Sequence, residues 1–243
     1  MATLVEDALE TYRDNIRLVL LFSIPFVVAF LIPLVAPLPT YLSSGGIFLR
    51  SASIFLNINV LSLAVIVISV FISLLFLSFA YVAISLIVKA KRTLSKTAAG
   101  VVRELEKYTG RVFVVLLLYA FVLTIVNVLS YFVGLQAIAT PVVGFFLFAL
   151  IFYAPAAIVI NNSGVLASMK QSALLVAKRP QYFLLWIALI VLAVSILDFL
   201  LIHITGTPAS SYLMLVLNSL FIVPYFVILQ AEAYMRRFSI LGR

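Results

Sequence analysis

The sequence predicts an all-α, polytopic integral membrane protein with six transmembrane helices in a single domain, residues 1–243. Three observations predict it: the composition, six long apolar stretches, and the clustering of basic residues between them. Of the 243 residues, 65% are apolar and 10% are charged, whereas soluble domains average about 45–50% apolar and about 25% charged residues. This composition excludes a soluble enzyme, a disordered tail and a secreted disulfide scaffold.

A membrane-spanning helix needs about 20 mostly apolar residues. Six stretches meet this requirement: 17–38, 58–88, 112–135, 141–160, 181–203 and 211–234. The segment 40–57, between the first two stretches, contains only a short apolar piece. We therefore expect it to form a loop or an interfacial half-helix.

The basic residues predict the orientation of the six spans. Fifteen of the sixteen Lys and Arg residues lie in segments 1–17, 89–111, 162–180 and 235–243, and only Arg50 falls on the other side. Because basic residues collect on the cytoplasmic side of a membrane protein, both termini are expected in the cytoplasm and the protein in the plasma membrane. Topology explains the net charge of +8 better than a nucleic-acid partner, and we expect none.

An amphipathic segment precedes each odd-numbered span. The three segments are 2–16, 93–109 and 163–179, and each places its apolar residues on one helical face. This pattern predicts helices that lie in the cytoplasmic membrane surface. The chain then divides into three pseudo-repeats, about 1–92, 93–162 and 163–243, each with a surface helix, an outward span and an inward span. Repeats of one orientation imply a pseudo-threefold axis along the membrane normal.

Four prolines interrupt the spans: Pro25 and Pro33 in the first, Pro155 in the fourth and Pro224 in the sixth. Proline lacks a backbone N–H, frees a carbonyl and kinks a helix. The kinks either bend the helices so that the bundle packs, or act as hinges that open a cavity at the membrane midplane.

Few residues could carry chemistry. The chain has no cysteine and a single histidine, His203, which excludes thiolate and multi-histidine metal sites. Asp198 is the only acidic residue well inside a span, and an intramembrane carboxylate is costly. Asp198 and His203 either reach the outer interface or form a proton-linked site in which Asp198 carries and His203 relays the proton. In a further alternative, Asp198 pairs with Asn127 or Asn218. No catalytic group, cofactor or metal site is expected.

The basic segments predict contacts with anionic lipid headgroups, because each basic residue near an anionic leaflet contributes about 1 kcal/mol. The expected contact residues are Lys89, Lys91, Arg92, Arg103, Lys170, Lys178 and Arg179.

Ser168 and Ser172 lie four residues apart in the third surface helix. Small residues at this spacing allow a neighbouring helix to approach closely, with the hydroxyls hydrogen-bonding across the contact. The alternative is that Ser172 contacts a lipid headgroup together with Lys170 or Lys178.

Two stretches resemble the signature of a broad group of six-span prokaryotic membrane proteins, which includes stand-alone archaeal proteins and the membrane domain fused to glycerophosphodiester phosphodiesterases. The matching residues are Gly164, Ser168 to Leu175, Pro224, Ala231, Tyr234, Arg236 and Arg237. Asn162 and Ser163 stand where the group often has an acidic residue before the glycine. The resemblance implies a helical membrane domain without its own catalytic centre. No phosphodiesterase domain is attached, so that activity is not expected.

Together these features predict a non-enzymatic membrane protein that binds anionic lipid, and a protein partner or further copies of itself, and thereby organises or perturbs the bilayer. A small transporter or channel, with a path between kinked helices, is the alternative. A lipid-modifying enzyme is the third.

Overall fold

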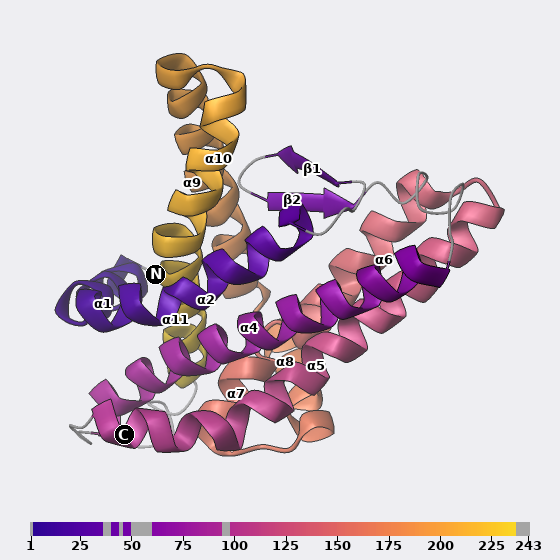
Figure 1. Cartoon of the computed structure of the whole chain (residues 1–243). Coiled ribbons are helices and arrows are strands. Elements are labelled where there is room, and N and C mark those ends of the chain that lie inside the picture. The colour runs from indigo at the N-terminus through magenta and orange to yellow at the C-terminus, as the bar shows by residue number, and fades with distance from the viewer. Residues whose placement is uncertain (1, 36–39, 44–45, 50–59, 94–97, 237–243) are drawn as a thin grey trace.

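The computed structural model describes residues 2–35, 40–43, 46–49, 60–93 and 98–236 (Figure 1). The helices are α1 (Ala2–Asp14), α2 (Ile16–Val35), α4 (Val60–Thr93), α5 (Ala98–Phe132), α6 (Gln136–Ile151), α7 (Ala154–Asn161), α8 (Val165–Lys178), α9 (Pro180–Thr205), α10 (Thr207–Leu217), the π-helix η1 (Asn218–Ile222) and α11 (Val223–Met235). Two short strands are β1 (Thr40–Ser43) and β2 (Gly46–Leu49).

The prediction of six spans is confirmed. Six helical runs of the described chain are long and apolar enough to cross a membrane: Ile16–Leu34, Val60–Lys91, Glu104–Phe132, Gln136–Asn161, Pro180–Thr205 and Ala209–Met235. Helices α6 and α7 together make the fourth span, and α10, η1 and α11 together make the sixth. The chain is therefore a multi-pass membrane protein.

The described part of the connection between the first two spans forms two paired strands and not the expected loop or half-helix, and residues 50–57 of that prediction lie outside the described residues. Strands β1 and β2 pair antiparallel, with Thr40 opposite Leu49 and Ser43 opposite Gly46. Short runs with Tyr, Ile and Phe on either side of a Ser/Gly pair favour a hairpin over a helix. The all-α description therefore holds for the spans but not for residues 40–43 and 46–49.

The predicted surface helices are separate elements in only two of the three units. Helix α1 ends before α2, and α8 ends before α9, which begins at Pro180. In the second unit, α5 runs without a break from Ala98 to Phe132. No proline interrupts it there, and Gly110 alone does not end a helix. The threefold repeat stays a prediction.

The core lies at one end of the bundle, which we call the basic end. It comprises the ends of α1, α4 and α11, the starts of α2 and α5, and all of α7 and α8. Buried residues concentrate there, in α4 from Ala80 to Val88, in the fourth span from Ile151 to Val159 and in α11 from Phe226 to Tyr234. In the apolar stretch of each span, buried residues make up 56% of span four and 50% of span six, but only 6% of span five. Spans four and six are therefore the central pair.

The opposite halves of the spans diverge. Figure 1 shows the α9–α10 hairpin leaning away from the α5–α6 hairpin. Large apolar side chains on both hairpins are exposed, among them Phe121, Phe132, Leu192 and Phe199. Apolar side chains on outward faces are what spans in contact with lipid require.

Helix α1 docks onto α11 through its apolar face and three polar contacts. Its Leu4 and Ala8 are buried. The Thr11 hydroxyl donates to the Glu232 carboxylate at 3.1 Å, and Arg236 forms an ion pair of 2.8 Å with Asp7. Arg236 also donates to the hydroxyl of Thr3 at 2.9 Å.

Substitution Thr11→Val tests this docking. Valine keeps the shape of threonine but removes a donor from Glu232, which is only 1% exposed. We expect the free energy of unfolding in detergent to fall by about 1–3 kcal/mol, because a buried carboxylate loses a partner. The matched control is Thr124→Val, whose exposed hydroxyl donates only to Ala120 O of its own helix. Equal losses in the two variants would contradict the role of Thr11.

Candidate functional site

The fourth span is broken at Phe152 and Tyr153, between α6 and α7. Pro155, the second residue of α7, causes the break, because it lacks an N–H and its ring clashes with the carbonyl of the preceding turn. Tyr153 and Phe152 are both buried. Backbone groups freed at such a depth need other partners, since an unsatisfied group in an apolar environment costs several kcal/mol.

Two other helices supply those partners. The Tyr153 N–H donates to the Ser172 hydroxyl of α8 at 2.8 Å, and the side-chain amide of Gln230 in α11 donates to Phe152 O. Ser168 is equally buried, but its hydroxyl donates to Val165 O within α8. Ser172 therefore joins two elements, whereas Ser168 only allows close packing.

A second polar cluster joins the ends of α7, α8 and α11. The Tyr234 hydroxyl donates to Gln171 Oε1 at 2.8 Å, and the Asn161 amide donates to the Tyr234 hydroxyl at 2.6 Å. The Asn161 amide also donates to Gln171 Oε1 at 3.2 Å. Tyr234 is fully buried. These contacts lock the helices that surround the break.

Arg111 of α5 binds the junction between α7 and α8. Asn162 takes a left-handed conformation with φ of 53° and ends α7. The Arg111 guanidinium donates to the backbone and side-chain oxygens of Asn162, at 3.3 and 3.1 Å, and to Ser163 O at 3.4 Å. A cation at a helix C-terminus is favourable because the last carbonyls lack helical partners.

The sixth span is distorted near Pro224 as well. A π-helical turn, η1, precedes Pro224, which is the second residue of α11. The indole N–H of Trp186 in α9 donates to Phe226 O at 2.8 Å. Pro25 and Pro33 lie inside α2, which continues through both. At Pro155 two neighbouring helices bond to the interrupted backbone, which favours the packing interpretation of that kink over the hinge.

Three basic residues are neutralised within the protein. Lys89 forms an ion pair of 3.1 Å with Glu104, and Lys91 forms pairs of 3.2 Å with Asp14 and 3.6 Å with Glu10. Arg236 pairs with Asp7 where α1 docks onto α11. Two further expected lipid contacts, Arg92 and Arg103, have side chains outside the described part of the structure.

Apart from Arg111, which binds the junction between α7 and α8, six basic residues make no ion pair with any residue that the structure describes: Arg13, Arg17, Lys107, Lys170, Lys178 and Arg179. Five of them are exposed and Arg179 is half-buried. All six lie at the basic end.

Helix α8 presents its unpaired cations together with apolar side chains. Leu166 and Leu174 are 78% and 45% exposed, and they alternate with Lys170 and Lys178 at four-residue spacing, so all four share one outward stripe. The opposite face buries Ser168, Ser172 and Leu175. A Leu-Lys-Leu-Lys stripe suits a membrane interface, where leucine enters the apolar layer and lysine extends its amine to the headgroups.

The polar residues predicted within the spans do not form one site. Asn127 Oδ1 accepts hydrogen bonds from Gln136 at 2.6 Å and Thr140 at 3.3 Å, within the α5–α6 hairpin. The His203 ring packs on the Phe199 ring, with centroids 5.0 Å apart, and Asn218 is buried in η1. Asp198 is half-buried and makes no hydrogen bond or ion pair within the described chain. The expected pairing of Asp198 with Asn127 or Asn218 is therefore not formed.

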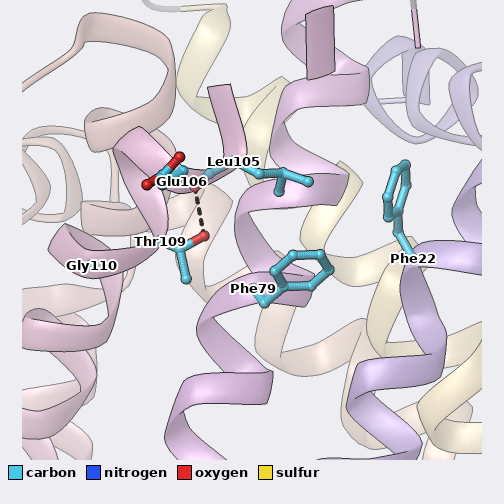
Figure 2. A pocket seen from close by; sticks show the side chains of 6 residues that line it. All are labelled: Phe22, Phe79, Leu105, Glu106, Thr109 and Gly110. Atoms are coloured by element: carbon cyan, nitrogen blue, oxygen red, sulfur yellow. Dashed lines mark hydrogen bonds between the residues drawn. The ribbon is translucent and has the colours of Figure 1, made fainter. Parts of the chain in front are cut away.

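A cavity of about 480 Å³ opens between α2, α4 and α5 at the basic end. Its lining residues are Phe22, Phe79, Leu105, Glu106, Thr109 and Gly110 (Figure 2). None of the polar residues predicted within the spans lines it. Among the described residues, no three His, Cys, Asp or Glu side chains lie close enough together to hold a metal ion.

Sequence reasoning missed Gln230 and the cluster around Tyr234. Gln230 is a lone amide that directly follows the apolar stretch 222–229. A polar side chain within a membrane span must find a hydrogen-bond partner. That signal could have identified Gln230, but not its partner at the break between α6 and α7.

Comparison of the chain with protein-family models, curated proteins and solved structures finds no match, so the resemblance to the six-span group stays a prediction.

The two buried serines of α8 offer a matched test of the helix break. Ser172→Ala leaves the Tyr153 N–H without its acceptor, and we expect a loss of about 1–3 kcal/mol in the free energy of unfolding. Ser168→Ala removes only a bond within α8, and we expect a change within about 0.5 kcal/mol. Denaturant unfolding in detergent measures both. If Ser168→Ala is the more destabilising variant, Ser172 is not the residue that stabilises the break.

Proposed function

We propose that this protein is a non-enzymatic integral membrane protein that binds anionic lipid headgroups at the basic end of its bundle and so organises the surrounding bilayer. The single observation that carries the proposal is the outward stripe of α8, where Lys170 and Lys178 alternate with Leu166 and Leu174. Under this proposal the basic end faces the cytoplasm, with both termini there, and the membrane is the plasma membrane.

The unpaired cations explain why the ligand is an anionic headgroup. Six basic residues at one end have no acidic partner among the described residues, and five are exposed. Each contributes about 1 kcal/mol when it lies within a Debye length of an anionic leaflet. The leucines of α8 hold the lysines at that depth, because burying their side chains in the acyl layer is favourable.

Two observations favour lipid binding over a transporter or channel. The backbone groups freed at the break of the fourth span bond to Ser172 and Gln230, and so are not open to a solute. Asp198, the predicted proton carrier, does not line the cavity at the basic end. A protein partner or a second copy remains part of the proposal, since the diverging halves of the spans expose apolar side chains.

Matched pairs of lysine substitutions test the proposal by native mass spectrometry of the protein extracted gently from its own membrane. Lys170→Gln with Lys178→Gln removes two unpaired charges. We expect retention of anionic lipid to fall about thirtyfold, from about 1 kcal/mol for each lysine, and to fall further with added salt.

The control is Lys89→Gln with Lys91→Gln, which removes the same charge from lysines that are ion-paired with Glu104, Asp14 and Glu10. We expect a several-fold smaller loss, because these charges are already neutralised. Equal losses would indicate that net charge alone attracts lipid. No loss in either pair would overturn the proposal.

A further inference from the structure

The cavity between α2, α4 and α5 has apolar walls. Phe22 of α2 and Phe79 of α4 are partly buried and pack against the core, and Leu105 of α5 is buried. Figure 2 shows these three side chains gathered at one end of the cavity, and Glu106, Thr109 and Gly110 at the other. Its volume of about 480 Å³ lies within the range of about 300–1,000 Å³ that small-molecule sites occupy.

The lining offers a guest one polar group, the Glu106 carboxylate. The Thr109 hydroxyl donates to Leu105 O at 2.7 Å (Figure 2) and so is already engaged. Glu104, two residues before Glu106, is paired with Lys89. Glu106 itself makes no ion pair or hydrogen bond with any described side chain, although the basic end holds six unpaired cations.

Gly110 leaves the polar end of the cavity open. A Cβ built at Gly110 would meet no atom within 4 Å, so packing does not require glycine there. Glycine within a helix is less stable than alanine. The absence of a side chain at this position therefore widens the cavity at a cost to α5.

We propose that this cavity binds one acyl chain of a phospholipid with a primary ammonium headgroup, whose ammonium donates to the Glu106 carboxylate. The apolar walls suit the acyl chain, and the ammonium of the zwitterionic headgroup complements the Glu106 carboxylate, which has no partner among the described side chains. A primary ammonium has three N–H donors, whereas the trimethylammonium of a choline headgroup has none. The site is distinct from the anionic-lipid surface of α8, because it recognises the ammonium group of a headgroup rather than a net negative charge.

Native mass spectrometry of the delipidated full chain in detergent tests the site, with phosphatidylethanolamine and phosphatidylcholine of identical chains as probes. We expect one equivalent of phosphatidylethanolamine to bind about tenfold more tightly than phosphatidylcholine, and Glu106→Gln to remove the difference. The matched control is Asp198→Asn, which removes the unpaired carboxylate of α9 and should keep the preference. Equal binding of both lipids by the unsubstituted chain overturns the proposal.

Gly110→Leu tests the acyl-chain part separately. Its side chain fills open space, so the fold should persist, and binding of both probes should fall at least tenfold. Ala167→Leu adds comparable bulk on the exposed face of α8 and should leave probe binding unchanged. Undiminished binding in Gly110→Leu overturns the assignment to this cavity. Both probes are zwitterionic, and Glu106→Gln should not reduce retention of anionic lipid, so failure of this proposal is distinguishable from failure of the proposed function.

Discussion

The backbone of the broken fourth span has to find hydrogen-bond partners in an apolar interior, and the packing of the basic end follows from this requirement. The helix of α6 ends shortly before Pro155, which has no backbone N–H to donate, and no water is available in the membrane interior to satisfy the freed groups. The Tyr153 N–H therefore bonds to Ser172 and Phe152 O bonds to Gln230. These two side chains come from α8 and α11, so three elements must meet at the break.

That meeting point accounts for the uneven distribution of the core. Around it, the Tyr234 cluster and the Arg111 cap hold the ends of α7 and α8, and Arg236 and Glu232 hold α1 against α11. Spans four and six are consequently the most buried. The opposite halves of the other spans have no comparable polar contacts between hairpins among the residues that the structure describes, and apolar side chains gain little from leaving lipid for one another. Their divergence in Figure 1 is consistent with that balance.

The six spans could be predicted from the sequence because length and apolarity decide them, and their ends agree within a few residues except at the third, which begins at Glu104 rather than 112. The surface helix of the second unit could not be separated from its span, since nothing in residues 106–111 ends a helix. The partners of Ser172 and Gln230 could not be predicted either, because they lie 19 and 78 residues away along the chain and depend on how three helices cross.

The charges of the basic end acquire different roles only in three dimensions. In sequence, Lys89 and Lys170 are equivalent basic residues near a membrane. In the structure, Lys89 pairs with Glu104, whereas Lys170 stands unpaired between Leu166 and Leu174. The same distinction separates Glu104 from Glu106, which lines the cavity. Under the two proposals, the cations beside the leucines of α8 bind anionic headgroups, and the Glu106 carboxylate beside the apolar cavity binds an ammonium. Selection among lipids, rather than attraction of negative charge alone, is therefore the property that this arrangement of charges supports.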